Sequence, residues 1–227
     1  MQLSADDPAN PRQRAAIELA ARQPFSIITG GPGTGKTFTL VRIVLTLQAA
    51  QPELRIALAA PTGKAAQRMQ AVLAEEFAQA GVATGKMQTA QTVHRLLGLG
   101  GAAPKYHAKN LLPFDLVVID EGSMLDLALA SQLFAAVGAG TRLIILGDAN
   151  QLAAVDAGAV LADLSKVQQL KPYQIELQES RRFDAQQGIG RLAAAVLSNS
   201  RAAIGQALRQ GGQVQQHLPN LEQPELS

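Results

Sequence analysis

The sequence predicts an α/β fold in which a parallel sheet is flanked by helices on both faces. Runs rich in Val, Ile and Leu, such as residues 114–119 and 141–146, are typical of parallel strands buried on both sides. Helix-forming stretches separate these runs, and this alternation favours a doubly covered sheet. A glycine-rich loop at residues 30–37 joins the first strand to a helix. With 47% apolar residues in a chain of 227, one substantial core can form.

The composition excludes several classes of protein. The chain has no Cys, which excludes disulfides and thiolate metal sites. It has neither a charged-then-apolar leader nor a long apolar run, so we expect a cytoplasmic protein without a membrane segment. A net charge of +2 says little about nucleic acid, and any basic surface must be local. With 4% aromatic residues and no Trp, a single-strand binder built mainly on base stacking is disfavoured.

The chain opens with a polar stretch, residues 1–10, which we expect to lie loosely on the surface. A helix follows from Pro11 over residues 12–20, with Asn10 as its N-cap. Residues 1–23 thus form a helical lead-in to the first strand. Gln13 taken alone would be an ordinary solvated side chain, but its amide both donates and accepts and so suits an adenine edge.

The next unit is a strand at residues 25–29, the loop 30–37 and a helix at residues 38–50, and its loop matches G-x-x-x-x-G-K-[ST]. Glycines let successive N–H groups point inward, which forms an anion nest at a helix N-terminus. A glycine-rich turn without chemistry is the alternative, which the flanking strand and helix disfavour. Lys36 would reach the β- and γ-phosphates of ATP, and Thr37 would ligate Mg²⁺. The predicted nucleotide contacts are Gln13, Gly31, Pro32, Gly33, Thr34, Gly35, Lys36, Thr37 and Phe38.

A second strand, loop and helix follow. The strand covers residues 54–60, and the helix presents Ala66, Met69, Leu73 and Phe77 on one face. The loop between them again offers a hydroxyl, a glycine and a lysine where a strand passes to a helix, which is where open α/β sheets bind phosphate groups. Those three residues are Thr62, Gly63 and Lys64.

Residues 81–113 are broken by glycines and contain one short helix at residues 92–97. This region is either a local basic patch or an ordinary solvated insertion, and charge alone leaves both open. Its basic residues are Lys86, Arg95, Lys105 and Lys109, with two of the three histidines.

Two more buried strands carry the expected chemistry. Residues 114–119 end in Asp120 and Glu121, and a helix follows at residues 125–137. Residues 141–146 end in Gly147 and Asp148. We expect further elements at residues 158–165, 174–177 and 187–197, and a frayed end at residues 211–227. The predicted motor domain is residues 24–200, followed by a flexible tail at residues 201–227.

The acidic strand ends predict hydrolysis of the bound nucleotide. Asp120 would hold the water shell of Mg²⁺, and Glu121 would polarise the water that attacks the γ-phosphate. Gln151 would lie beside that phosphate and sense its presence. Arg181 or Arg182 would neutralise charge on the transferred phosphoryl, and spacing does not choose between them.

These motifs resemble superfamily 1 helicases and, within them, the RecD family, the alpha subunit of exodeoxyribonuclease V. The segment Thr-x-His-Arg-Leu-Leu-Gly joined to Gly-Asp-x-x-Gln-Leu is the specific part of the resemblance. The matching segments, in family order, are residues 12–13, 30–37, 60–66, 92–98, 118–121, 146–155, 180–183 and 188–196.

The resemblance implies a RecA-like P-loop NTPase fold and a translocase that uses ATP and Mg²⁺ to move 5′ to 3′ on single-stranded DNA during repair and recombination. It also implies partnership with the beta and gamma subunits of exodeoxyribonuclease V. It assigns Lys36, Glu121, Gln151 and Arg182 to catalysis. It places Thr62, Gly63, Lys64, Thr92 and His94 near the strand.

The sequence departs from the family pattern at two points. Gly122 stands where the family usually has Ala, a change that we expect to be tolerated. No second motor domain follows, so we expect either a separated first motor domain or a truncated gene product, with weak ATP binding and little hydrolysis. Two alternatives remain: a relaxase-type or RNA-directed P-loop helicase, and a truncated docking module without activity.

Overall fold

The computed structural model describes residues 10–101, 103–151 and 160–178. The chain divides into two compact units, residues 1–178 and 179–227, and the description below concerns the first. The expected helix at residues 187–197, the tail at residues 211–227 and the arginines Arg181 and Arg182 lie outside the described residues. The domain limits expected from the sequence stay a prediction.

The described part of the chain is built on a parallel sheet in the order β3-β2-β5-β6-β1-β7, with β4 pairing with β2 beside β3. This confirms the predicted fold class. The strands are β1 (Phe25–Gly30), β2 (Arg55–Ala60), β3 (Lys86–Met87), β4 (Gln91–Thr92), β5 (Leu116–Ile119), β6 (Arg142–Gly147) and β7 (Gln174–Leu177).

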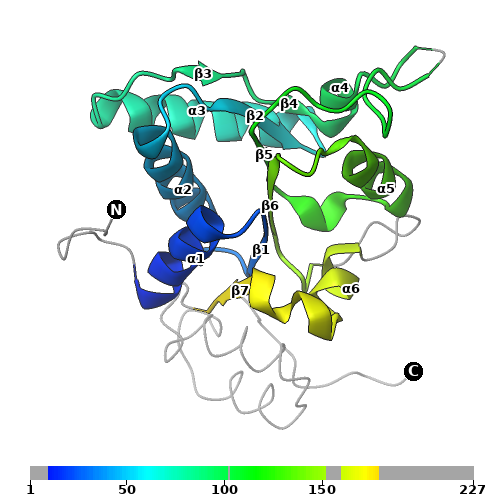
Figure 1. The fold of residues 1–227 in the computed structure, drawn as a ribbon. Coiled ribbons are helices and arrows are strands. Elements are labelled where there is room, and N and C mark those ends of the chain that lie inside the picture. Colours follow the sequence, from blue (N-terminus) through cyan, green and yellow to red (C-terminus); the bar gives the residue numbers. More distant parts are fainter. Residues whose placement is uncertain (1–9, 102, 152–159, 179–227) are drawn as a thin grey trace, which may run out of the picture. The chain divides into compact units, whose positions relative to one another are not determined.

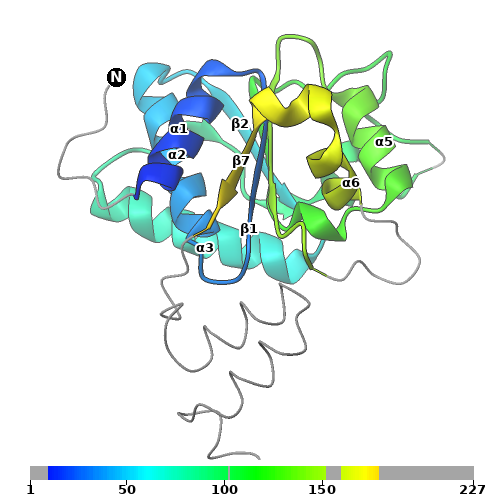
Figure 2. The same ribbon diagram turned by 90° about the horizontal axis from the view of Figure 1, so that it is seen from below.

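Helices cover both faces of this sheet (Figures 1 and 2). One face carries α1 (Pro11–Arg22), α2 (Lys36–Ala50) and α3 (Gly63–Gln79). The other carries α4 (Val93–Leu97), α5 (Leu127–Ala136) and α6 (Val160–Lys166). Two 3₁₀ helices, η1 (Gly122–Met124) and η2 (Gln168–Tyr173), complete the elements.

Alternation along the strands separates the two halves of the core. In β5, Leu116 and Val118 pack with the α1–α3 side, whereas Val117 and Ile119 pack with the α4–α6 side. Successive side chains of a strand point to opposite faces, so an uninterrupted apolar strand buries residues on both. This is the reason that the apolar runs predicted the architecture.

The observed element limits differ from the expected ones where capping decides them. Helix α2 begins at Lys36, two residues earlier than expected, with Gly35 as its N-cap. The helix expected at residues 125–137 is instead η1 followed by α5, because the Asp126 side chain accepts a hydrogen bond from Leu129 N–H at 2.6 Å and caps α5. Strands β3 and β4 have two residues each, too few for a periodic signal.

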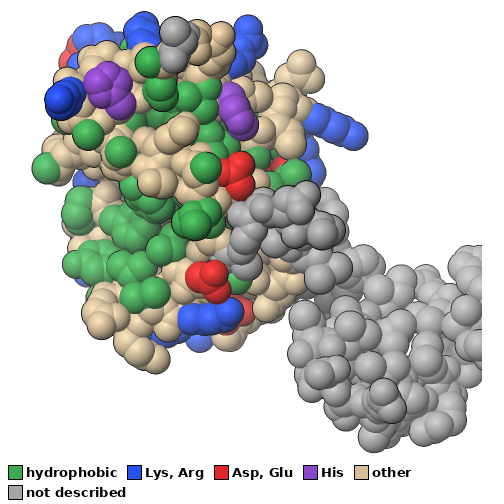
Figure 3. All heavy atoms as spheres, turned by 90° about the vertical axis from the view of Figure 1, so that its right-hand side faces the viewer, with side chains coloured by type: hydrophobic (Ala, Val, Ile, Leu, Met, Phe, Trp, Pro, Cys, Tyr) green, Lys and Arg blue, Asp and Glu red, His purple; other side chains and the backbone are tan. Residues whose placement is uncertain are grey.

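The outer face of α5 exposes large apolar side chains without a charge among its ten residues. Leu127 is 70% exposed, Phe134 38% and, on the preceding η1, Met124 41%. Hydrophobic side chains gather on the side of the molecule that carries α5 in Figure 1 (Figure 3). Within the described part of the chain, no helix is long and apolar enough to span a membrane.

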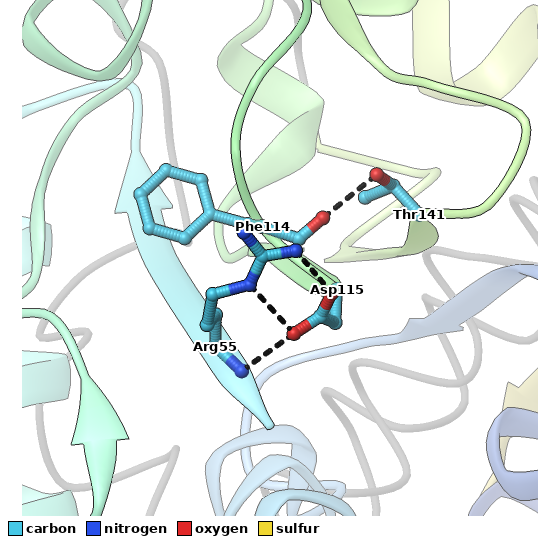
Figure 4. Close-up of polar contacts among 4 residues, drawn as sticks. All are labelled: Arg55, Phe114, Asp115 and Thr141. Carbon is cyan, nitrogen blue, oxygen red and sulfur yellow. Dashed lines mark hydrogen bonds and ion pairs between the residues drawn. The ribbon is translucent and has the colours of Figure 1, made fainter. Parts of the chain in front are cut away.

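The amino ends of β2 and β5 are joined by a side-chain ion pair (Figure 4). Asp115 Oδ2 accepts from Arg55 Nε at 3.0 Å and from Arg55 N–H at 2.9 Å, and its Oδ1 lies 2.6 Å from Arg55 Nη2. These bonds lower the pKa of Asp115 to about 2. On the next strand connection, Thr141 Oγ1 donates to Phe114 O at 2.7 Å. These contacts help to hold the amino ends of β2, β5 and β6 in register.

We expect Asp115→Asn to remove an acid-sensitive contribution to stability. A carboxyl with a depressed pKa stabilises the fold above its unfolded pKa, about 3.9, and this contribution is lost as the pH falls through about 2. Because the pair is solvent-accessible, the Tm difference from wild type at pH 7 should be at most about 3 °C. It should shrink between about pH 4 and pH 2.

Thermal unfolding followed across this pH range tests the expectation. Asp163→Asn removes the same charge from the exposed α6 and serves as the control. A difference that grows on acidification would contradict the assigned role of the Arg55–Asp115 pair.

Candidate functional site

The carboxyl ends of three adjacent strands bring the predicted catalytic segments together. Strand β1 pairs with β6, with Thr29 opposite Gly147, and β6 pairs with β5, with Ile145 opposite Ile119. In parallel strands these ends share one edge of the sheet, which is where open α/β sheets bind ligands. The loop 30–37, the pair 120–121 and the segment 148–151 all begin at this edge.

The backbone of the loop 30–37 has the bends that an anion nest requires. Gly33 and Gly35 have φ of 82° and 86°, in the left-handed region that favours glycine. Thr34 Oγ1 donates to Gly31 O at 2.9 Å and closes the loop on itself. Gly35 is the N-cap of α2 and provides no side chain to bond the first N–H groups of that helix. Those N–H groups and the helix dipole suit a phosphate.

Lys36 is the cation of this edge. Its Nζ donates to Gly30 O and, at 3.0 Å, to Gly31 O. Burial lowers the Lys36 pKa, and the charges of Asp148, Asp120 and Glu121 act in the opposite direction. The structure therefore brings the predicted phosphate-binding lysine within electrostatic reach of carboxylates from two other strand ends.

Asp120 is the half-buried first acid of the pair. Burial raises its pKa, while the hydrogen bond from Glu121 N–H to Oδ1, at 2.9 Å, and the charges of Lys36 and Arg68 lower it. A bound cation would hold this carboxylate ionised.

The residues present fit Mg²⁺. Asp120 and Thr37 offer the hard oxygen donors that Mg²⁺ prefers. Among the described residues no group of three or more His, Cys, Asp and Glu side chains forms a metal cage. Mg²⁺ is usually held by one or two carboxylates together with nucleotide phosphates. Thr37 and Asp120 would therefore bind Mg²⁺ as its complex with ATP.

Glu121 is held in an unusual backbone conformation. Its φ of 53° is positive, which no other non-glycine residue within the described ranges shows. A left-handed conformation costs a residue with a side chain about 1–2 kcal/mol. Such outliers cluster at functional sites, where they fix the direction of a side chain. Catalysis by Glu121 stays a prediction that this conformation supports.

Ser123 is a residue of the site that the sequence reasoning did not include. Its Oγ donates to Gln151 Oε1 at 2.7 Å and joins the loop after β5 to the loop after β6. Gln151 N–H in turn donates to Asp148 O at 3.1 Å. The available signal was a hydroxyl two residues after Glu121, and it has meaning only once β5 and β6 are known to be neighbours. Ser123 thus orients the predicted γ-phosphate sensor.

The two loops approach so closely that glycine is required on each. A Cβ on Gly122 would lie 2.5 Å from Ile145 Cγ2 and 3.2 Å from Leu146 O. A Cβ on Gly147 would collide with Leu161 and would lie 2.9 Å from Ser123 N. Gly122, which departs from the family's usual Ala, therefore fits this chain closely.

We expect Gly122→Ala to destabilise the fold by about 1–3 kcal/mol through overpacking. Gly140→Ala is the matched control, because nothing lies within 4 Å of a Cβ there. Ile145→Leu removes the Cγ2 atom at nearly constant volume and should restore part of the loss. Chemical denaturation of wild type, Gly122→Ala, Gly140→Ala and the double variant Gly122→Ala/Ile145→Leu measures these differences. Equal stability of Gly122→Ala and Gly140→Ala would refute the close contact.

The predicted DNA-contacting residues also converge, at the edge beyond β2. Strand β4 pairs with the end of β2, with Thr92 opposite Ala60. Thr62 caps α3 by accepting from Ala65 N–H, and Thr92 caps α4 by accepting from Arg95 N–H, both at 3.2 Å. Gly63, Lys64 and His94 are exposed beside these caps. Their role in DNA binding stays a prediction.

The structure decides between alternatives that the sequence left open for Gln13 and for the candidate basic patch. Gln13 is not a solvated side chain: its exposed fraction is 0%. Lys86 does not share a patch with Arg95, because β3 pairs with the amino end of β2 and β4 with its carboxyl end. Lys86 instead pairs with Glu53 at 2.5 Å.

Adenine reading by Gln13 stays a prediction, and Arg182 lies outside the described residues.

Comparison with known proteins agrees with this geometry. A family model described as "AAA domain" matches residues 13–157. The chain is 43% identical over 213 residues to the RecBCD enzyme subunit RecD of Mycolicibacterium smegmatis, which covers 88% of this chain and 38% of that protein. It is 40% identical over 223 residues to the same subunit of Haemophilus influenzae, with 80% and 34% covered.

Two helicases are also similar. The ATP-dependent RecD2 DNA helicase of Deinococcus radiodurans is 40% identical over 154 residues, covering 68% of this chain and 19% of that protein. A crystal structure of Pif1 helicase from Bacteroides, in complex with ADP-AlF3 and ssDNA, shares the fold with a TM-score of 0.55 and 19% identity, covering 88% of this chain and 49% of that one.

The chain spans little more than a third of the length of the RecD subunits that it matches. The family model, by contrast, covers well over half of this chain. With its RecD-like sequence and its parallel sheet carrying the glycine-rich loop 30–37, the chain belongs to the AAA domain family.

Proposed function

We propose that the chain is the ATP-binding motor domain of a RecD-like DNA helicase subunit. It would couple ATP hydrolysis to 5′-to-3′ translocation on single-stranded DNA in double-strand break repair and recombination. One observation carries the proposal: the loop 30–37 with Lys36, the pair Asp120–Glu121 and Asp148 follow β1, β5 and β6, three adjacent parallel strands, at one edge of the sheet. This is the arrangement that phosphoryl transfer needs, since its catalysis depends on positioning and charge stabilisation.

Each residue of the site has a distinct proposed role. The backbone N–H groups of residue 31 and residues 33–38, together with the Lys36 ammonium, would hold the triphosphate; Pro32 has no N–H to offer. Thr37 and Asp120 would hold Mg²⁺, which supplies charge neutralisation between the β- and γ-phosphates when bound. Glu121 would take a proton from the attacking water, and Gln151, oriented by Ser123, would contact the γ-phosphate. Arg182 would supply a further positive charge.

The proposed DNA track follows the edge of β2 and β4. Hydroxyls, backbone N–H groups and one lysine hold a sugar-phosphate chain without reading its bases. The proposed set is Thr62, Gly63, Lys64, Thr92 and His94. By similarity to RecBCD subunits, the proposed partners are exodeoxyribonuclease V beta and gamma subunits, and the proposed compartment is the cytoplasm.

Binding measurements on the 227-residue chain test the proposal. We expect Mg²⁺-dependent binding of ATP and slow hydrolysis, because the chain corresponds to little more than a third of its RecD relatives and their remaining parts would contribute further charges to the site. When single-stranded DNA and RNA of equal length compete for the chain, we expect the DNA to bind more tightly. A preference for RNA would favour the RNA-directed alternative, and no nucleotide binding would refute the motor assignment.

A docking module without activity is the second candidate, and the exposed apolar side chains of η1 and α5 favour it. Leu127, with 70% of its side chain exposed, is the most exposed of the large apolar residues in the described segments. Exposed apolar clusters are typical of protein interfaces. This candidate predicts partner binding that survives the loss of nucleotide binding.

A further inference from the structure

Gln13 connects helix α1 to the loop 30–37. Its side chain is fully buried. Gln13 Oε1 accepts from Asn10 N–H at 3.0 Å, and Gln13 Nε2 donates to Thr34 O at 3.1 Å. A carbonyl oxygen can only accept and a backbone N–H can only donate, so these two partners fix which way the amide points. The donor faces the loop and the acceptor faces the start of α1.

The start of α1 is itself rigid. Asn10 Oδ1 accepts from Gln13 N–H at 2.8 Å, so the two residues bond each other reciprocally in a capping box. Pro11 occupies the first turn of α1 and restricts its backbone further. Ala16, Ile17 and Ala20 anchor the same helix in the core. The capped and buried helix α1 therefore fixes the position of the Gln13 amide.

Gln13 lies directly against the bend of the loop. A Cβ on Gly35 would collide with Gln13 Nε2, so the glycine is needed for space as well as for its φ of 86°. The carbonyl that Gln13 holds belongs to the peptide unit between Thr34 and Gly35. In a trans peptide the C=O and the N–H point in opposite directions. Holding the Thr34 C=O toward α1 therefore directs the Gly35 N–H away from α1.

We infer that Gln13 is a positioning residue that orients the Thr34–Gly35 peptide for phosphate binding. It sets the affinity for the phosphates of any nucleotide, rather than selecting adenine. The inference rests on the proposed function, in which the loop 30–37 holds those phosphates. The two bonds to Asn10 and Thr34 use one N–H and one lone pair of the Gln13 amide, and the fully buried side chain presents neither of the remaining two to solvent.

The test measures the affinity of the full chain for Mg²⁺-ATP, Mg²⁺-GTP and Mg²⁺-tripolyphosphate by titration calorimetry. Gln13→Glu keeps the shape and the acceptor toward Asn10 but sets an oxygen against Thr34 O. Gln13→Leu removes both polar groups at similar size and gives an answer if Gln13→Glu folds poorly. Gln132→Glu adds the same charge on exposed α5 and is the control.

We expect both Gln13 variants to weaken all three ligands by a similar factor, about tenfold. The ratio of ATP to GTP affinity should stay within about twofold. Tripolyphosphate has no base, so its weakened binding cannot arise from lost adenine contacts.

Three results would overturn the inference. The first is ATP weakened with tripolyphosphate unchanged, which would make Gln13 an adenine reader. The second is unchanged affinity for all three ligands. The third is fewer binding sites with unchanged affinity per site, which would show a role in folding alone. Wild-type protein that binds none of the three ligands would instead overturn the proposed function.

Discussion

Lys36→Ala is expected to weaken ATP binding at least about a hundredfold. The Lys36 ammonium is the cation of the phosphate loop, and charge-assisted hydrogen bonds to phosphate are each worth about 1.5–3 kcal/mol. Its two hydrogen bonds to Gly30 O and Gly31 O hold the ammonium against the loop 30–37. Calorimetric titration of Mg²⁺-ATP into the wild-type and variant chains measures the loss.

Lys64→Ala provides the matched control for Lys36→Ala. Like Lys36, Lys64 lies after a strand of the sheet and in the first turn of the following helix. Its strand and helix are β2 and α3, at the proposed DNA-binding edge. We expect Lys36→Ala to lose ATP and keep single-stranded DNA, and Lys64→Ala to do the reverse. Partner binding that persists in Lys36→Ala after nucleotide binding has been lost would favour the docking module.

Glu121→Gln should leave ATP binding within about threefold of wild type and reduce hydrolysis by a factor of about 10²–10⁴, the usual contribution of a general base. The amide keeps the size of the side chain but cannot accept the proton of the attacking water. Since we expect slow hydrolysis by the 227-residue chain, the measurement is a single turnover with protein in excess over ATP.

Two further variants separate the possible causes of such a loss. Glu75→Gln, on the exposed surface of α3, removes the same charge away from the site and should hydrolyse ATP like wild type. Asp120→Asn should instead change the dependence on Mg²⁺, because Asp120 is the proposed metal ligand. Unimpaired turnover by Glu121→Gln would assign the proton transfer to another group.

The hydrogen bond from Ser123 suggests how the proposed role of Gln151 would be carried out. Ser123 ties Gln151 to the loop that carries Glu121, so a movement of one loop is transmitted to the other through a 2.7 Å hydrogen bond. If Glu121 and Gln151 have their proposed roles, such a connection suits a switch that responds to the γ-phosphate.

The local pattern of the sequence determined the fold class and predicted where the main site would lie. Apolar runs that are buried on both sides predict parallel strands, and the loop 30–37, between a strand and a helix, predicts an anion nest. Both depend on residues that are neighbours along the chain. The helix that starts at Pro11 with Asn10 as its cap was predictable for the same reason.

Only the tertiary structure decided the contacts between segments. The sequence does not state that β5 lies beside β6, so the Ser123–Gln151 bond and the close fit of Gly122 against Ile145 could not be anticipated. Gln13 and Thr34 are 21 residues apart, and a glutamine that ordinarily faces solvent is buried here because a backbone carbonyl of the loop meets its amide. Burial and pairing at a distance arise from the packing of strands and helices, which local propensity does not encode.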